Sequence, residues 1–544
     1  MLALVCTLVS ALSVLPVGQA AAWWATAVYY RIDVDSFKDT NGDGLGDLQG
    51  TSKQLSYVKA LGSDAVILSP VAATSRDCAA PGVMDFTAID DRYGMLADFS
   101  ELVQKANKLD LKVVVSLDLR TISSDSEWFR SSASRAAGYE DHIVWVNEKP
   151  DDVQDDTWWV WHEQRQGYWA ARDNSSLLNL CSARVAAALA SAQCAWLRRG
   201  ANGLLYRPDF TRDVDCGVRL VSTLAVDAAR CARAADLDVP VIIAESALGA
   251  STAARYYGEG EAGANSVVSV VGGPRAPGRG PPPAPDLALS LHAALLLAPP
   301  DAAVAWLTSA GGEARLATRL GADLVDCFNL LALVLPGAAL LQQGDELGAA
   351  DAILDWAETR KCWPRPAHSA AAPFPWDDTF KAGFTGGEPW LPLAPNYRYA
   401  NAKTEFANEL SHVSVARTAA AVRRSPAIGP HIEIKRLGPT LAVLRWGGGG
   451  SLLYVGNLGR STAESEVGRV PGLPAQMTVA AGSGSSSYPP GTHVPTDKGV
   501  RLGPGEAVLL VGPPRHCSGP GPVDKIATKL TEGWQKINKY FSNL

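Results

Sequence analysis

The stretch WWATAVYYRIDVDSFKDTNGDGLGDLQG, residues 23–50, carries the strongest structural signal in the chain. Its second half is an acidic loop with oxygen-bearing residues at alternate positions and glycines between them. Hard cations such as Ca²⁺ take six or more oxygen ligands, and glycines let a loop wrap tightly. The loop is not an EF-hand, because Gly50 stands at its twelfth position, where that motif has a glutamate. The spacing predicts a structural Ca²⁺ site, with a solvated turn as the alternative. The expected ligands are Asp39, Asn41, Asp43, the Leu45 carbonyl and Asp47.

This opening resembles that of insect maltases (α-glucosidases) and of the related amino-acid-transporter heavy chains, both in glycoside hydrolase family 13. The resemblance continues at residues 61–70, 128–129, 315–321 (RLATRLG) and 335–348 (LPGAALLQQGDELG). It covers most of residues 23–515 in the family's order. It implies a TIM (β/α)₈ barrel, a small domain inserted after the third strand, and a C-terminal antiparallel β-sandwich.

The hydrophobic pattern favours the same fold. Eight short apolar runs alternate with longer amphipathic ones, which is typical of parallel βα units closed into a barrel. The expected strands are residues 27–32, 65–68, 113–117, 203–206, 241–245, 266–271, 303–307 and 338–342. The expected helices include residues 48–61, 95–109, 185–199 and 218–235. Further on, short runs separated by glycine-rich turns predict the sandwich strands, at residues 431–435, 441–446, 451–455, 477–480 and 507–511.

The domain organisation follows from these patterns and from the resemblance. With 544 residues, the chain is too long for one core. The predicted segments are a signal peptide (1–22), the first part of the barrel (23–118), the inserted domain (119–178), the second part of the barrel (179–430) with a Pro/Gly-rich loop (272–285), the β-sandwich (431–515), and a linker with an amphipathic helix (516–544).

The N-terminus and the cysteines predict a secreted or extracellular membrane-associated protein. Residues 2–22 are apolar and uncharged and end in three alanines, as a cleaved signal peptide does; an uncleaved anchor is the alternative. Removing Cys6 from the nine cysteines leaves eight, an even number suited to disulfides. Local pairs are expected among Cys181, Cys194, Cys216 and Cys231. Asn174 begins an Asn-Ser-Ser glycosylation site, and a net charge of −7 argues against nucleic acid as a partner.

The sequence departs from the family at its catalytic positions. Retaining glycosidases need a carboxylate nucleophile and a carboxylic acid about 5–5.5 Å apart. The fourth-strand block, GVDGFRVDA in the family, reads GANGLLYRP at residues 200–208, which puts Arg207 at the nucleophile position and Leu205 at that of its supporting arginine. Glu245 ends the block VIIAE and matches the proton donor.

The other substrate-binding positions also differ from the family. Gly312 stands at the position of the third carboxylate. The nearby Asp209 and Glu313 are not expected to restore the geometry. The family's third-strand PNH corresponds to residues 119–121 (LRT), and its GYD segment to residues 80–82 (APG).

These losses predict a maltase-like pseudoenzyme that acts as a binding or scaffold protein, for which a carbohydrate ligand is doubtful. One alternative is a heavy-chain-like subunit of an amino-acid transporter; another is an unorthodox active α-glucosidase. Residues 523–544 place Ile526, Leu530 and Trp534 at helical spacing among lysines. Such a helix can lie on a membrane surface or in a partner's groove, or pack on its own domain.

Overall fold

The computed structural model describes residues 22–150, 157–208, 214–246, 248–258, 262–271, 282–309, 314–360, 365, 367–484 and 486–515. They belong to two compact units, a barrel unit up to Ala421 and a C-terminal unit from Val422. Several features expected from the sequence lie outside the described residues: the signal peptide up to residue 21, Asp209, residues 272–281 of the Pro/Gly-rich loop, Gly312, Glu313, and the linker and helix at 516–544.

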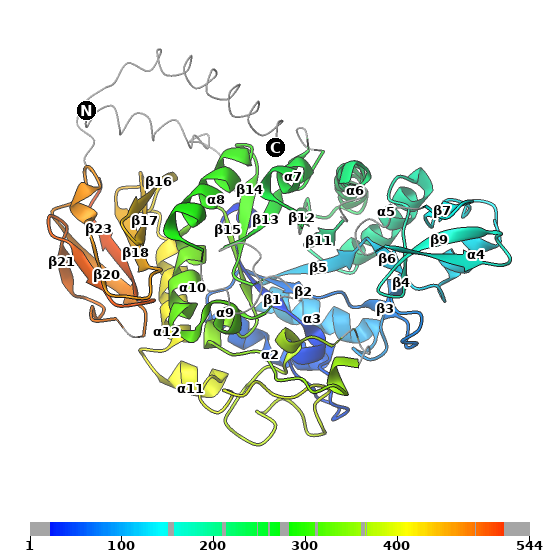
Figure 1. Ribbon diagram of the computed structural model, residues 1–544, viewed down its shortest axis with the longest axis horizontal. Helices are drawn as coiled ribbons and strands as arrows, with labels where there is room; N and C mark the ends of the chain where they lie inside the picture. Colours follow the sequence, from blue (N-terminus) through cyan, green and yellow to red (C-terminus); the bar gives the residue numbers. More distant parts are fainter. Residues whose placement is uncertain are drawn as a thin grey trace, which may run out of the picture. The chain divides into compact units, whose positions relative to one another are not determined.

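A closed barrel of eight parallel strands forms the core of the barrel unit (Figure 1). In the order in which they pair, the strands are β1 (Val28–Ile32), β15 (Ala338–Gln342), β14 (Ala303–Leu307), β13 (Ser266–Val270), β12 (Val241–Ala244), β11 (Gly203–Arg207), β5 (Lys112–Asp118) and β2 (Ala65–Leu68). Buried apolar side chains such as Ile67, Leu205 and Leu340 pack together inside. The predicted TIM barrel is confirmed, and each strand end lies within one residue of its expected position.

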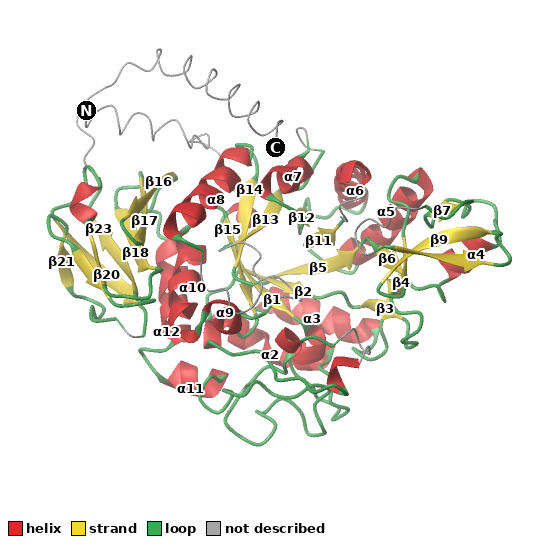
Figure 2. Ribbon diagram, in the orientation of Figure 1, coloured by secondary structure: helices red, strands yellow, loops and turns green. Residues whose placement is uncertain are grey.

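Helices surround the barrel (Figure 2). They are α2 (Leu48–Ala60), α3 (Leu96–Lys108), α5 (Ala183–Arg198), α6 (Val214–Ala234), α7 (Ala250–Ala253), α8 (Ala284–Leu297), α9 (Leu316–Leu320), α10 (Val325–Val334), α11 (Ala402–Ala407) and α12 (His412–Arg423). Helix α2 begins at the end of the acidic loop, because the Asp47 carboxylate accepts a hydrogen bond from the Gly50 amide and so caps the helix. Among the described residues, no helix has both the length and the apolar character needed to span a bilayer.

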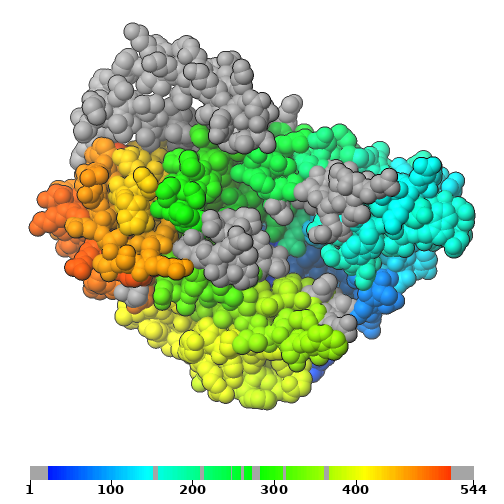
Figure 3. All heavy atoms as spheres, viewed as in Figure 1, coloured from blue at the N-terminus to red at the C-terminus, as the bar shows by residue number. Residues whose placement is uncertain are grey.

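The inserted segment forms a second sheet together with strands β3 and β4, with the order β3-β4-β6-β10-β9-β7 and with β8 paired to β9. Its elements are β3 (Ala72–Thr74), β4 (Val83–Ile89), β6 (Thr121–Ile122), α4 (Glu127–Ala133), β7 (Trp145–Val146), β8 (Trp158–His162), β9 (Gly167–Arg172) and β10 (Ser175–Leu177). Strands β3 and β4 come from the segment that follows β2, so this sheet includes residues from before the insert expected at 119–178. The insert forms a lobe on one side of the barrel, drawn in cyan in Figure 3.

The C-terminal unit is antiparallel, as predicted. A six-stranded sheet has the order β16-β17-β18-β23-β20-β21, and β19 pairs with β22. The strands are β16 (His431–Leu437), β17 (Thr440–Trp446), β18 (Ser451–Asn457), β19 (Ala463–Ser465), β20 (Gln476–Gly482), β21 (His493–Pro495), β22 (Val500–Leu502) and β23 (Ala507–Gly512). Side chains from both sheets, among them Leu453, Leu510 and Leu502, share one buried core.

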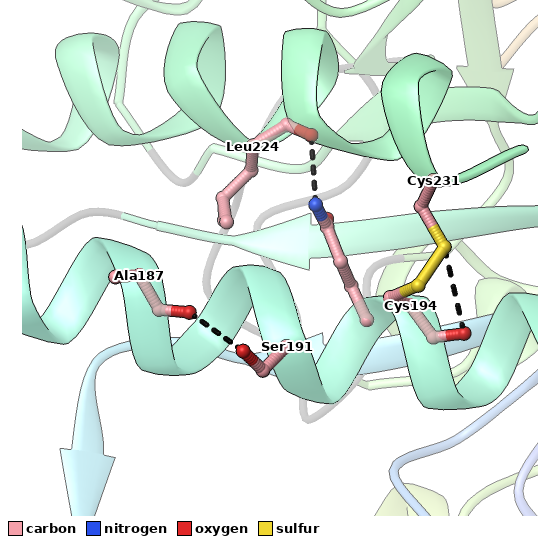
Figure 4. The surroundings of a disulfide bond; sticks show 6 residues. Ala187, Ser191, Cys194, Leu224 and Cys231 are labelled. Carbon is pink, nitrogen blue, oxygen red and sulfur yellow. Dashed lines mark hydrogen bonds between the residues drawn. A yellow bond between two sulfur atoms is a disulfide. The ribbon is translucent and has the colours of Figure 1, made fainter. Parts of the chain in front are cut away.

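Two disulfides join the segments that come before and after β11 in the sequence. Cys181 pairs with Cys216, and Cys194 pairs with Cys231. The second bond joins α5 to α6 (Figure 4). The four cysteines expected to form local pairs therefore do so, and the strand that carries Arg207 lies in the sequence between the two cross-linked segments.

Candidate functional site at the carboxyl ends of the barrel strands

Arg207 and Glu245 lie side by side at the end of the barrel where TIM-barrel enzymes hold their active sites. Arg207 is the last residue of β11, and Glu245 directly follows the neighbouring strand β12. The Glu245 amide donates a hydrogen bond to the Tyr206 carbonyl at 2.9 Å, which continues the pairing of the two strands. The structure thus brings together the positions expected for the nucleophile and the proton donor.

Glu245 is held by two arginines. The Nε of Arg207 donates to Oε2 of Glu245 at 3.1 Å, and Nη1 of Arg31 donates to Oε1 at 3.0 Å. The side chains of Arg31, Glu245 and Arg207 are 1%, 11% and 21% exposed. Strand β1, which carries Arg31, lies across the barrel from β12 in the strand order. The Arg31 side chain therefore crosses the barrel interior to reach the glutamate.

Arg207 supplies no carboxylate at the position where a retaining hydrolysis uses one as its nucleophile. A guanidinium remains protonated at physiological pH and offers no oxygen to attack a sugar. Leu205, at the position of the supporting arginine, is fully buried in the apolar core of the barrel. Asp118 is the register partner of Arg207 on the neighbouring strand β5. Its carboxylate accepts hydrogen bonds from Arg120, at 2.8 and 2.5 Å.

A second charged cluster follows β1. The Asp33 carboxylate accepts a hydrogen bond from Nε2 of Gln342 at 3.1 Å and lies 3.6 Å from Arg365. Asp35 receives two hydrogen bonds from Arg365, at 2.7 and 3.0 Å. Burial alone would raise the pKa of Asp33, but the positive charges of Arg365 and Arg31 outweigh this effect, so its pKa lies below its ordinary value. Sequence reasoning missed this cluster, because Asp33 and Asp35 lie beyond the end of β1, Asp35 in a 3₁₀ turn, and Arg365 is 330 residues further along the chain.

The segment at the family's sugar-gripping position is tied to the inserted sheet. The carbonyl of Ala80 accepts a hydrogen bond from the Ser123 hydroxyl at 2.6 Å. The carbonyl of Pro81 accepts one from the Ser175 hydroxyl at 2.9 Å. None of the side chains of residues 80–82 can form the polar contacts that a tyrosine and an aspartate would make with a sugar.

The acidic loop has the oxygen donors for a hard cation, but its carboxylates point to backbone amides. Asp39 accepts hydrogen bonds from the amides of Asn41, Gly42 and Gly44, at 2.9, 2.8 and 2.9 Å. Asp47 accepts one from the Gly50 amide at 2.6 Å as it caps α2. In the part of the chain that the structure describes, no three His, Cys, Asp or Glu side chains converge on a metal position. A carboxylate that accepts an amide hydrogen bond keeps further lone pairs for a cation, so calcium at this loop stays a prediction.

Asn174, the predicted glycosylation acceptor, is exposed in the turn between β9 and β10, with a φ of 63°. Its modification also stays a prediction.

The barrel, the insert after the third strand, the C-terminal antiparallel unit and the glutamate after the fifth strand define a protein of the glycoside hydrolase type. The family model described as "Alpha amylase, catalytic domain" matches residues 31–228 and 288–429, more than half of the chain. The chain therefore belongs to this family, glycoside hydrolase family 13.

Within the family, insect maltases are among the relatives of this chain. Maltase 1 of Drosophila virilis is 28% identical over 469 residues, covering 74% of this chain and 73% of that protein. The salivary alpha-glucosidase of Anopheles gambiae is 26% identical and covers 74% of this chain and 78% of its own. The structure of trehalulose synthase MutB from Pseudomonas mesoacidophila MX-45 superimposes with a TM-score of 0.72, at 20% identity, over 91% of this chain and 100% of MutB. At that identity the likeness shows the fold alone.

Proposed function

We propose that this protein of carbohydrate-metabolism lineage does not hydrolyse glycosides, and that its barrel serves binding or the presentation of a partner surface. One observation carries the proposal: the residue at the nucleophile position, Arg207, forms an ion pair with the residue at the proton-donor position, Glu245. Hydrolysis with retention needs two carboxylates across the scissile bond, and here a carboxylate faces a cation.

The second guanidinium strengthens this argument. A general acid must carry its proton on an oxygen that reaches the leaving group. Both oxygens of Glu245 instead accept hydrogen bonds, one from Arg31 and one from Arg207. The sequence at the third carboxylate position is Gly312, which supplies no acidic group.

Hydrolysis assays with matched variants test the proposal. The full-length secreted protein is assayed on maltose, sucrose and p-nitrophenyl α-glucoside beside an active insect maltase. We expect no turnover above that of a mock purification. Glu245→Gln and Arg184→Gln serve as a pair, because Arg184 forms its ion pairs with Glu140 and Asp141 and not with Glu245. Turnover that survives Arg184→Gln but is abolished by Glu245→Gln would show a working glycosidase and overturn the proposal.

Secretion is the compartment that the disulfides favour, since such bonds persist in oxidising environments. Two of the insect relatives are salivary by name, which agrees with secretion. Attachment to a membrane or to a partner protein through residues 523–544 belongs to the same proposal. Liposome flotation of the full-length protein, compared with a chain that ends at Arg515, tests the membrane arm.

A further inference from the structure

A small pocket opens at the end of the barrel opposite the barrel mouth, which is the end where Arg207 and Glu245 lie. It is formed at the amino ends of three neighbouring strands, β5, β11 and β12. Lys112 is the first residue of β5, and Asn202 and Val239 come just before the other two strands. The volume of the pocket is about 130 Å³. A cavity of about 150 Å³ holds one benzene molecule, so a group of about six non-hydrogen atoms fits inside.

Two opposite charges line this pocket and have no partners there. Within the part of the chain that the structure describes, the Lys112 ammonium and the Asp238 carboxylate form no hydrogen bond and no ion pair, either with each other or with other groups. Asp238 is exposed and Lys112 is half-buried, so a molecule that enters the pocket reaches both. An ammonium group only donates hydrogen bonds and a carboxylate only accepts them. A ligand that carries one charge of each sign would therefore satisfy both side chains.

Other parts of the wall favour a cationic group beside Asp238. Helices α5 and α6 both end at this pocket, because Gly200 and Leu237, which follow them in the sequence, are part of its wall. The carboxyl end of a helix carries a partial negative charge. The indole of Trp23 also lines the pocket, and aromatic rings attract ammonium groups over their faces. An ammonium group therefore finds three favourable kinds of contact here.

The opening of the pocket is apolar. Leu237 and Val239 stand on either side of Asp238 in the sequence, and they are 39% and 65% exposed. Deeper in the wall, Leu197 and Ala232 are buried. An aliphatic side chain on the ligand would remove the exposed apolar surface of Leu237 and Val239 from water, which stabilises the complex.

From these contacts we propose that the pocket binds a free α-amino acid with an aliphatic side chain, of the class of leucine. Asp238 accepts charge-assisted hydrogen bonds from the ammonium group of the ligand, and Lys112 donates them to its carboxylate. The aliphatic side chain packs on Leu237 and Val239. The charged part of an amino acid, from the ammonium nitrogen to the carboxylate, is small enough for the enclosed volume. A neutral sugar of similar size would leave both charges uncompensated.

Titration calorimetry of the full-length protein with four compounds tests the proposal. L-Leucine carries both charges, L-leucinamide lacks the carboxylate, N-acetyl-L-leucine lacks the ammonium group, and D-glucose is neutral. We expect saturable binding of L-leucine, binding of each derivative weaker by about fivefold, which is the scale of one exposed ion pair, and no binding of glucose. Failure of the folded protein to bind L-leucine would overturn the inference. Binding of glucose, or binding of both derivatives as tightly as L-leucine, would also overturn it.

Variants assign each charge of the ligand to its side chain. Lys112→Gln should weaken binding of L-leucine by about fivefold and leave that of L-leucinamide unchanged. Asp238→Asn should weaken binding of L-leucine by a similar factor and leave that of N-acetyl-L-leucine unchanged.

A second lysine and aspartate serve as matched controls. Lys403 and Asp378 form an ion pair with each other and do not line the pocket, so Lys403→Gln and Asp378→Asn should not change the affinity for L-leucine. If Lys112→Gln and Asp238→Asn also leave this affinity unchanged, in variants with native circular dichroism, the assignment of the site is refuted.

This inference does not depend on the proposed function, because the pocket and the Arg207–Glu245 pair lie at opposite ends of the barrel strands. Turnover of maltose in the same preparation would overturn the proposed function alone, whereas absence of L-leucine binding would overturn this inference alone.

Discussion

Replacing Glu245 with glutamine is the most direct test of the cluster that Arg31, Glu245 and Arg207 form at the carboxyl ends of the barrel strands. The substitution keeps the size and shape of the side chain but removes the only carboxylate that pairs with Arg31 and Arg207 among the described residues. Breaking a buried ion pair by removing one partner costs about 3–5 kcal/mol, because the remaining charge stays buried. Arg207 is 21% exposed and can regain water, so we expect a loss near the lower limit, about 3 kcal/mol.

Urea unfolding followed by circular dichroism measures this loss. The urea concentration at the midpoint should fall, while the dependence of the free energy of unfolding on urea concentration stays unchanged. Arg207→Gln is the matched comparison, since it removes the more exposed cation and leaves the Arg31–Glu245 pair in place. We expect it to cost only about 1 kcal/mol, as for a partly exposed pair. The double variant Arg31→Gln with Glu245→Gln should lose less stability than the two single variants together, by about 1 kcal/mol or more. The reasoning is wrong if Glu245→Gln unfolds with wild-type stability, or if Arg207→Gln is the more damaging change.

Three other outcomes follow from the structure. Burial raises the pKa of Glu346 to about 7, well above its ordinary value. The folded state then holds this proton more tightly than the unfolded state, so the proton stabilises the fold fully below about pH 4.5, and about 3 kcal/mol of the free energy of unfolding is lost as the pH rises through 7. Glu346→Gln should remove this pH dependence of the free energy of unfolding. An unchanged pH dependence would contradict the assignment. Replacing Cys194 and Cys231 with serine opens a loop with a sequence separation of 37 residues and should lower the free energy of unfolding by about 3–4 kcal/mol, while equal stability in urea would show that the bond is dispensable. If the acidic loop binds calcium, EDTA should lower the melting temperature and added Ca²⁺, but not Mg²⁺, should restore it; a melting temperature indifferent to both leaves the loop as a capped turn.

The barrel could be predicted from the sequence because its signals are local. Each strand is a short apolar run such as residues 303–307, and each expected helix shows its own periodicity. The β3–β4 hairpin could not be placed in the insert sheet, because neither strand is a continuous buried apolar run and the partner of β4, β6, lies about 40 residues further along the chain.

The site was predicted only in part, for a similar reason. Motif alignment places Arg207 and Glu245 on neighbouring strands, and strand adjacency explains their ion pair. The role of Arg31 depends on the closure of the ring, which brings β1 opposite β12. Nothing in the residues around position 31 indicates which strand faces it. The pairing of Asp35 with Arg365 likewise joins residues 330 positions apart in the chain.

The staples across α5 and α6 have a mechanical consequence. Two covalent links join the segment before β11 to helix α6 after it, so these two parts of the chain cannot separate from each other during local opening. The breathing that admits a molecule to the mouth is therefore expected from other parts of the ring. In amide hydrogen exchange, the backbone amides of β11 should be among the slowest of the barrel strands to exchange. They should exchange much faster once the disulfides are reduced.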